Sequence, residues 1–467
     1  MASRFGYAVW AKIRLNSEGN APMPGVDDAA LNRLEGRLDE WNCRGLWIIF
    51  HDYSGRSCAK WIPRNAVQST VQRGAIFARA NLNFTIDDHQ VPQPRFGADS
   101  GDFFVVADHD TLAPVPYHPG TARVHGWMRT EEGDVWEGCP RTRLAIQLNR
   151  LTERGLSARV AFEPEFSLYR QAPDGTLQPA DQHAMYSVDR ISSQFGLLDR
   201  IQSTLAEQAV DVIQVGSEYG KGQLEINLAH QTPIKAADDL LVFRDTVRAL
   251  AREDGLIATF MPKPYTAAAG NGLHVHLSLW DANGQNDRST GDQPLGLSSV
   301  MSHFIGGVLE HAPAICGVAA PTVNSYKRLQ PASWAPAHIA YASGNRSALV
   351  RIPGSHRRRL EFRSGDNTSN PYLLLTALIS AGIDGLDREI APGEPADEDL
   401  GHAAGEDIRF LPRTAGEALD AVEACKAVMD GLGPVCGPEL LRVKRYELAR
   451  YDVEVGDWER DVYLERV

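Results

Sequence analysis

The sequence has few cysteines and no long apolar run, and each shortage argues against a class of protein. Its 467 residues include six cysteines, which lie far apart and form no C-x-x-C pair. A disulfide framework or a structural zinc site is therefore not expected, and a reducing compartment fits the chain better. The longest apolar run, residues 372–383, is too short to span a bilayer. The first residues show no basic stretch before an apolar segment, so we expect no signal peptide and a cytoplasmic location.

Positive charge is also in short supply. The chain has 47 Lys and Arg residues against 60 Asp and Glu residues, which gives a formal net charge of −13 at pH 7. A chain this acidic is a poor candidate for binding the phosphate backbone of a nucleic acid. Its composition, 43% hydrophobic and 23% charged, is typical of a globular protein with a large core. The length allows roughly two to four domains.

Common nucleotide-binding and hydrolase motifs are absent as well. The sequence contains no G-x-x-x-x-G-K-[ST] loop, no G-x-G-x-x-G at the start of a helix, no H-E-x-x-H and no G-x-S-x-G. If the protein handles phosphate, we expect arginines and metal ions to hold it in place of a glycine-rich loop.

Four short segments carry the chemistry that is present. Each alternates apolar and polar residues, which predicts a strand with one apolar and one polar face. The segments are 160–169, 223–228, 273–279 and 359–363, and their polar faces hold Glu163, Glu165, Gln223, Glu225, Asn227, His274, His276, Ser278, Arg359, Glu361 and Arg363. Pro164 lacks a backbone N–H and predicts an edge or a bulge at that point.

Two interpretations of these faces compete. The first is an ordinary antiparallel sheet with one solvated face, which the absence of Lys and Thr from the four faces disfavours. The second is a binding site, because clustered carboxylates repel unless a cation neutralises them, and carboxylates with imidazoles suit Mg²⁺ or Mn²⁺. Arginines beside them suit phosphate or carboxylate groups. The pattern therefore predicts metal-assisted phosphoryl transfer.

An ordered series of motifs resembles the glutamine synthetase family. The motifs are E-P-E-F at 163–166, E-Y-G-K-G-Q-L-E-I at 218–226, F-M-P-K-P at 260–264, G-N-G-L-H-V-H-L-S at 270–278, P-T-V-N-S-Y-K-R-L at 321–329, N-R at 345–346, R-I-P at 351–353 and D-N-T-S-N-P-Y-L-L-L at 366–375. They occur in the order of the family and span most of residues 160–375. The N-terminal part matches more weakly, through 51–63 and 74–80.

The resemblance implies an α+β fold with two domains. We expect an N-terminal β-grasp domain over residues 1–118 and a glutamine-synthetase-type α/β catalytic domain with an antiparallel sheet over 119–467, joined by the proline-rich segment 112–120. Apolar spacing predicts helices over 26–42, 371–387, 415–431 and 437–451, among others. The resemblance also implies a homo-oligomer, most often a dodecamer of two hexameric rings, in which the neighbour's N-terminal domain completes each active site.

The same resemblance implies the reaction and the residues that serve it. ATP would phosphorylate the γ-carboxylate of L-glutamate, and an amine would displace phosphate from γ-glutamyl phosphate. Two or three Mg²⁺ or Mn²⁺ ions are implied, one held by Glu165, Glu218 and Glu225 and a second held by Glu163, His274 and Glu361. The remaining implied roles are catalytic for Arg346, Arg351 and Arg359, substrate binding for Gly270, Arg328 and Arg363, and ATP binding for His276 and Ser278.

The sequence departs from the family at the two acidic positions that hold ammonium. Ala78, after Gly74-Ala-Ile-Phe77, lies where the family has an aspartate, and Trp334, six residues after Arg328, lies where it has a glutamate. A pocket without anions binds ammonium poorly, and tryptophan offers an apolar face. We therefore expect a less polar organic amine: an aromatic amine such as aniline, which is neutral at pH 7, or a short alkylamine, for which tryptophan can form a cation–π site.

Two other readings stay open. One is an ordinary glutamine synthetase with a rearranged ammonium site. The other is a non-catalytic relative, which the presence of all six metal-ligand positions disfavours. Residues that replace the missing base are not fixed by the sequence, although Tyr117, Tyr219 and His338 are candidates by residue type.

Overall fold

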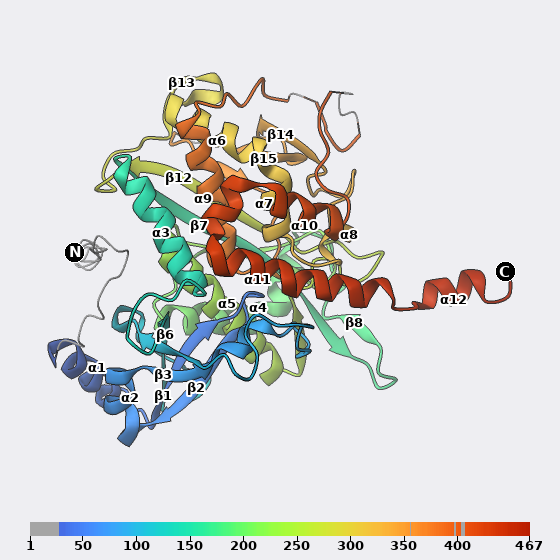
Figure 1. Ribbon diagram of the computed structural model, residues 1–467. Coiled ribbons are helices and arrows are strands. Elements are labelled where there is room, and N and C mark those ends of the chain that lie inside the picture. Colours follow the sequence, from blue (N-terminus) through green and yellow to red (C-terminus); the bar gives the residue numbers. More distant parts are fainter. Residues whose placement is uncertain (1–27, 355, 397, 403–406) are drawn as a thin grey trace.

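The computed structural model describes residues 28–354, 356–396, 398–402 and 407–467 (Figure 1). Two β-sheets organise this part of the chain, one of six strands near the N-terminus and one of nine strands in the rest. Residues 1–27, 355, 397 and 403–406 lie outside it. The N-terminal residues, where we expect no signal peptide, and the start of the helix expected at 26–42 lie outside the described residues.

The first sheet has the strand order β2-β1-β6-β4-β3, with β5 paired to β6. Its strands are β1 (Gly45–His51), β2 (Ser57–Pro63), β3 (Ala75–Ala78), β4 (Asp102–Ala107), β5 (Ala113–Pro114) and β6 (Thr121–Arg129). β1 and β6 are parallel, and the other pairs are antiparallel. Helices α1 (Asp28–Glu40) and α2 (Val67–Arg73) belong to the same part of the chain, and α1 buries its leucines at helical spacing.

This sheet continues past residue 118, where the sequence placed the domain boundary. β6 runs from Thr121 to Arg129 and pairs with β1, β4 and β5. The proline-rich segment at 112–120 therefore forms β5 and the turn that leads into β6. Prolines mark turns within a sheet as readily as they mark linkers between domains, so the position of the domain boundary stays a prediction.

The second sheet has the order β14-β15-β16-β12-β7-β10-β9, with β8 and β11 also paired to β7. Its pairs are antiparallel except for β14 with β15. The strands are β7 (Leu156–Gln171), β8 (Leu177–Pro179), β9 (Val212–Ser217), β10 (Gln223–Leu228), β11 (Leu256–Thr259), β12 (Leu273–Asp281), β14 (His338–Ser343), β15 (Ala348–Ile352) and β16 (Leu360–Phe362); β13 (Thr290–Gln293) lies outside the sheet. The four polar-faced segments predicted from the sequence are β7, β10, β12 and β16 with its flanking residues.

Helices pack around this second sheet (Figure 1). They are α3 (Pro140–Glu153), α4 (Val188–Glu207), α5 (Pro233–Glu253), α6 (Ser299–Glu310), α7 (Ala312–Ala319), α8 (Ser325–Arg328), α9 (Pro371–Asp387), α10 (Ala415–Ala424) and α11 (Lys426–Asp452). The last helix, α12 (Asp457–Tyr463), is not among them. The predicted break between 431 and 437 is a kink at Gly433 within α11, and the helices separate at Cys425 instead.

Helix α9 is apolar on all sides and almost completely buried, as such a composition requires. The Asn370 side chain caps its first turn by accepting hydrogen bonds from the backbone N–H groups of Tyr372 and Leu373. Gly307 of α6 and Gly385 of α9 let these two helices approach closely, because a Cβ at Gly385 would come within 2.6 Å of the Gly307 backbone nitrogen. The core of the larger part of the chain is thus assembled around one helix.

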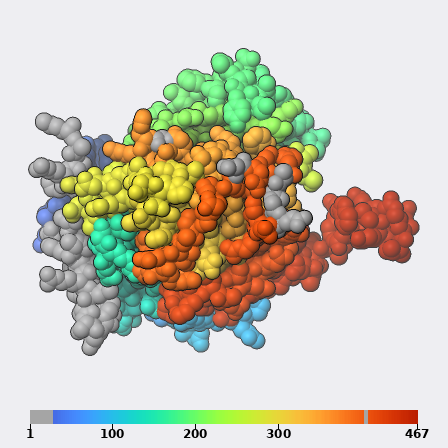
Figure 2. All heavy atoms as spheres, turned by 90° about the horizontal axis from the view of Figure 1, so that it is seen from above, coloured from blue at the N-terminus to red at the C-terminus, as the bar shows by residue number. Residues whose placement is uncertain are grey.

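At the C-terminus, α12 projects away from the body of the molecule (Figures 1 and 2). Among the described residues, no helix is both long and apolar enough to cross a membrane. All six cysteines are free thiols.

Candidate active site

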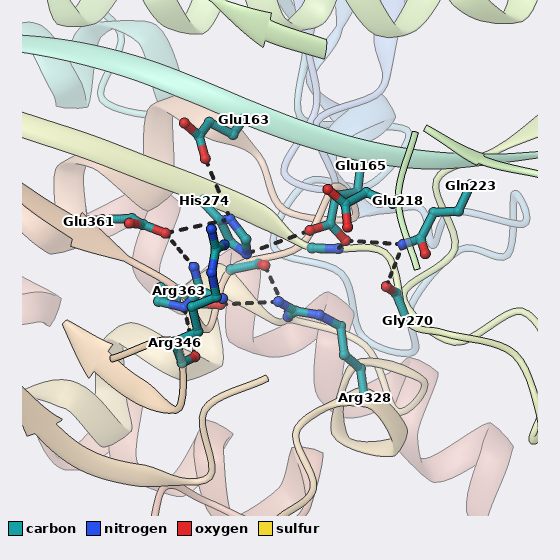
Figure 3. Close-up of polar contacts among 12 residues, drawn as sticks. Glu163, Glu165, Glu218, Gln223, Gly270, His274, Arg328, Arg346, Glu361 and Arg363 are labelled. Carbon is teal, nitrogen blue, oxygen red and sulfur yellow. Dashed lines mark hydrogen bonds and ion pairs between the residues drawn. The ribbon is translucent and has the colours of Figure 1, made fainter. Parts of the chain in front are cut away.

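Antiparallel pairing brings the predicted polar faces together on one side of the second sheet. Glu163 of β7 pairs with His274 of β12, Glu165 of β7 pairs with Glu225 of β10, and His276 of β12 pairs with Glu361 of β16. Residues opposite each other in a sheet point to the same face, as do residues two apart on one strand. The result is a continuous cluster of carboxylates, imidazoles and guanidinium groups (Figure 3).

The sheet also explains how a proline is tolerated at residue 164, although this residue does not lie at an edge of the sheet. β7 is central and changes partner at this point. Residues up to Pro164 pair with β12, and residues from Glu165 to Ser167 pair with β10. The proline therefore lies at the junction of two ladders, and the two glutamates on either side of it face the cluster.

His274 occupies the centre of the cluster and is buried. Its Nδ1 lies 3.7 Å from an oxygen of Glu163 and 3.7 Å from an oxygen of Glu361, and its Nε2 lies 3.7 Å from Glu165. Two groups of potential metal ligands have their atoms within 4.8 Å of one another: Glu163, Glu225 and His274, and Glu163, His276 and Glu361. Four of the six expected metal ligands, Glu163, Glu225, His274 and Glu361, belong to these groups, which are partitioned differently from the two sets that the resemblance implies.

Electrostatics favour a cation at this place. Burial, together with the negative charges of Glu165, Glu163 and Glu218, raises the pKa of Glu225 to about 9. Burial and Glu165 likewise raise the pKa of Glu218. A divalent ion would remove this repulsion, and the oxygen-rich donor set with one or two imidazoles suits Mg²⁺ or Mn²⁺. The residues present therefore fit the implied metal ions.

The other side of the cluster is rich in positive charge. Burial opposes ionisation of Glu361, but His274, Arg363 and Arg351 outweigh it and lower the pKa of this carboxyl. Arg351 Nε lies 2.6 Å from Glu361 Oε2, and Arg363 donates to the other carboxylate oxygen. Burial also opposes ionisation of Glu163, yet hydrogen bonds with His274 and His276 hold the pKa of Glu163 well below its usual range.

Neighbouring groups orient several of the carboxylates. Glu165 Oε2 accepts hydrogen bonds from the backbone N–H of Gly272 at 2.7 Å and from the Gln223 side chain at 3.2 Å. Gln223 also donates to the Gly270 carbonyl at 2.8 Å, which ties the loop at Gly270 to the cluster. The Tyr186 hydroxyl donates to Glu218 Oε2 at 2.9 Å. Such second-sphere contacts fix the geometry of ligands before an ion binds.

His276 links the two charged halves of the site. Arg359 Nε donates to His276 Nδ1 at 3.0 Å, and His276 Nε2 lies 2.9 Å from Glu163 Oε1. Because Nδ1 accepts, the proton of a neutral ring is on Nε2 and faces Glu163. Ser278 follows on the same face, where its hydroxyl accepts a hydrogen bond from the Trp280 indole at 2.9 Å.

Other predicted residues lie at the margin of the cluster. Arg328 is buried and donates to the backbone carbonyls of Arg363, Ser364 and Gly365, so it holds the segment that carries Arg363. Arg346 is exposed, and its carbonyl accepts a hydrogen bond from Arg363 at 3.0 Å.

The two positions that depart from the family are not part of the cluster. Ala78 ends β3, which belongs to the first sheet. Trp334 is 70% exposed in the loop before β14. Of the three candidate bases, Tyr117 packs on His118, His338 packs on Phe410, and Tyr219 is exposed next to Glu218.

Sequence reasoning missed two residues of this site. Tyr186, which orients Glu218, lies in a loop with a positive φ of 56° and follows no periodic pattern. Asn367 donates to the carbonyls of Glu165 and Gly272 at 3.1 Å each. Asn367 lies within the D-N-T-S-N-P motif, so the sequence could have pointed to it. A motif alone does not show which groups a side chain contacts.

Three comparisons connect the chain with known proteins. The family described as glutamine synthetase, catalytic domain, matches residues 137–463. A glutamate–methylamine ligase from Methyloversatilis universalis is 37% identical over 447 residues, which cover 92% of this chain and 98% of that protein. A glutamine synthetase from Halobacterium salinarum is 38% identical over 373 residues, which cover 77% of this chain and 82% of that protein. A solved structure of a GmaS/ADP complex has a TM-score of 0.84 at 32% identity and covers 92% of this chain and 99% of that chain.

Proposed function

Because this chain belongs to the glutamine synthetase family, within its glutamate–amine ligase branch, we propose that it forms a γ-glutamyl amide from L-glutamate and an organic amine with ATP. One observation carries the proposal: four strands place carboxylates, imidazoles and arginines on a single face of the sheet. Groups suited to bind a cation thus lie beside groups suited to pair with phosphate, which supports a role in phosphoryl transfer.

The chemistry explains why both charges are needed. A carboxylate cannot release hydroxide easily, so ATP first converts the γ-carboxylate of glutamate into γ-glutamyl phosphate, and the amine then displaces phosphate. Two or three Mg²⁺ or Mn²⁺ ions held by the six acidic and imidazole ligands would neutralise the phosphate oxygens. Arg351 and Arg359 are proposed to approach the transferring group, with Arg346 beside them, and His276 and Ser278 to contact the nucleotide. Arg359 fixes the tautomer of His276 through its hydrogen bond to Nδ1.

Glutamate is proposed to bind beside the Gly270 loop. The loop cannot carry a side chain at this residue, because a Cβ at Gly270 would lie 2.9 Å from the Pro262 carbonyl oxygen. Arg363 would face the substrate carboxylates or the phosphate, and Arg328 would support it through the carbonyls of the same segment.

The amine is proposed to bind at the loop that carries Trp334. This residue has a φ of 64°, and Ala332 in the same loop has a φ of 61°. A left-handed backbone conformation costs roughly 1–2 kcal/mol for a residue with a side chain. Residues strained in this way cluster at functional sites, so two of them in one loop support a role for this loop in binding. Similarity to a methylamine ligase favours a short alkylamine, with an aromatic amine such as aniline as the second candidate. Ala78 would reach the site from the neighbouring subunit.

The assembly and location are part of the same proposal. Exposed apolar residues gather at the C-terminal segment, where Val453, Trp458 and Leu464 are at least 65% exposed. Such a segment is suited to burial against another subunit, which supports a homo-oligomer such as a dodecamer of two hexameric rings. We propose that the first sheet forms the β-grasp domain and that this domain ends in the segment between β6 and α3. We also propose a cytoplasmic location, which the six free thiols favour.

A panel of amines tests the proposal directly. Phosphate release from ATP is measured with glutamate and Mg²⁺ and with ammonium, methylamine, isopropylamine, putrescine or aniline, and each γ-glutamyl product is identified by mass. We expect turnover with an organic amine and little turnover with ammonium. Strong turnover with ammonium would return the protein to ordinary glutamine synthesis, which the 38% identity to the Halobacterium salinarum enzyme keeps as the second candidate function. No turnover with any amine would favour a non-catalytic relative.

A further inference from the structure

Away from the candidate active site, a cysteine, a histidine and an aspartate form a connected chain. Cys425 Sγ lies 3.3 Å from His311 Nδ1, and His311 Nε2 lies 2.6 Å from Asp384 Oδ2. The three residues come from different places: Cys425 between α10 and α11, His311 between α6 and α7, and Asp384 in α9. Arg388, the residue that follows the end of α9, donates to the same aspartate oxygen at 2.8 Å, which favours the ionised carboxylate.

The order of the three groups is that of an activated nucleophile. The carboxylate faces one ring nitrogen of His311, and the sulfur faces the other. The hydrogen bond with Cys425, together with that to Asp384, raises the pKa of His311 to about 8. Burial opposes ionisation of Cys425, but the contact with His311 and the backbone N–H groups of Val428 and Ala427 outweigh it and lower the pKa of the thiol.

Other cysteines of the chain show the opposite behaviour. Burial raises the pKa of Cys58 to about 12 and that of Cys316 to about 12. Cys58 is only partly buried, like Cys425, so exposure alone does not separate the two thiols. The difference is the imidazole and the start of α11 beside Cys425, which are the surroundings that activate thiols in proteins.

A pocket gives small molecules access to this thiol. Cys425, His311 and Asp384 line a surface pocket of about 540 Å³ between α7, α9, α10 and α11. Small-molecule sites range over roughly 300–1,000 Å³, so a tripeptide-sized group fits. The rim carries both signs of charge, with Arg150 and Lys426 against Asp387 and Asp430. Residues of α9, α10 and α11 supply much of the lining. Figure 2 shows orange and red C-terminal segments side by side on the face in view.

From this arrangement we propose that Cys425 is a modification site that exchanges with a zwitterionic low-molecular-weight disulfide. The Cys425 thiolate attacks one sulfur of the disulfide, and a new S–S bond to Sγ forms as the old S–S bond breaks. The electron pair of the broken bond leaves with the second sulfur as a thiolate, so Cys425 is oxidised and the released half is reduced. His311 holds the proton that Cys425 gives up, and Asp384 keeps the imidazolium oriented.

The test uses the full-length protein and oxidised glutathione as the probe. The rate of mixed-disulfide formation is followed at every cysteine by peptide mass spectrometry between pH 5.5 and 9. We expect Cys425 to react at least ~10-fold faster than Cys58 and to keep reacting below pH 7, because a thiolate beside an imidazolium persists there. His311→Gln should slow Cys425 by about 10-fold and move the midpoint of its pH profile toward that of an ordinary thiol, about 8.5, while Cys58 stays unchanged as the internal control.

Two results would overturn the proposal. One is a Cys425 rate no greater than that of Cys58, and the other is a folded His311→Gln protein that reacts with the wild-type pH profile. If circular dichroism shows that the variant does not fold, the wild-type pH profile decides the question with iodoacetamide as a second probe: a midpoint at or above the ordinary thiol value refutes an activated thiolate. Each of these readouts is independent of ligase turnover, so failure here leaves the proposed function untouched.

Discussion

Arg351 Nε lies 2.6 Å from Glu361 Oε2, and the two residues are directly opposite each other on β15 and β16. Glu361 has no exposed surface, and Arg363 donates to its second oxygen. The same carboxylate lies 3.7 Å from His274 in the acidic half of the cluster. One buried residue therefore joins the groups that would hold a cation to the groups that would face phosphate.

Glu361→Gln should disable the ligase. The amide keeps the shape of the side chain but removes the charge that a cation and two arginines share. We expect turnover to fall about 100-fold or more, as when one preorganised electrostatic group of a site is lost. The measurement is amine-dependent phosphate release with product detection by mass. Glu253→Gln, an exposed residue at the end of α5, is the matched control and should stay close to wild type; near-normal activity of Glu361→Gln would contradict the assigned role.

Mg²⁺ should stabilise the protein through the crowded carboxylates. An ion present at about 100 times its Kd adds about 2.7 kcal/mol to the free energy of unfolding, which appears as a higher midpoint in thermal unfolding. Glu225→Gln should reduce the gain in stability that Mg²⁺ gives. Without Mg²⁺ this variant should be at least as stable as wild type, because Glu225 lies among Glu163, Glu165 and Glu218 and its charge is repelled. An equal Mg²⁺ response in the two proteins would argue against a metal site here.

The residues of this site could be predicted from the sequence to different degrees. Alternation of polar and apolar residues located β7, β10, β12 and the face on which His274 lies, because a strand has a period of two. Register could not be predicted, since the pairing of Glu165 with Glu225 depends on strands far apart in the chain. Glu218 lies in the turn after β9 and has no periodic signal, so only the motif pointed to it. The strand β5 within the proline-rich segment 112–120 could not be predicted either, because its pairing with β6 depends on residues outside the segment.

Trp334→Glu should change which amine is preferred. A carboxylate on this exposed loop would attract ammonium and remove the apolar face, so the ratio of kcat/KM for methylamine to that for ammonium should fall by about 10-fold. Trp334→Gln is the matched control because it removes the ring without adding charge. If the glutamine variant shifts preference as far as the glutamate variant, the ring and not the charge governs selection. No shift in either variant would exclude the loop from the amine site.

Gly385→Ala should destabilise the protein through the contact between α6 and α9. A Cβ at this residue would come within 2.6 Å of the Gly307 nitrogen and would also collide with the His303 carbonyl, and both are backbone atoms that cannot rotate away. Overpacking of this kind costs about 1–3 kcal/mol, so the thermal unfolding midpoint should fall. Gly196→Ala in α4 is the matched control, because nothing lies within 4 Å of its added Cβ. That exposed helical glycine should gain about 0.5–1 kcal/mol on substitution, since alanine favours the helix. If the unfolding midpoint falls for Gly385→Ala and rises for Gly196→Ala, the close approach of α6 and α9, and not the loss of a glycine as such, accounts for the destabilisation. A higher midpoint in both variants would contradict the tight contact.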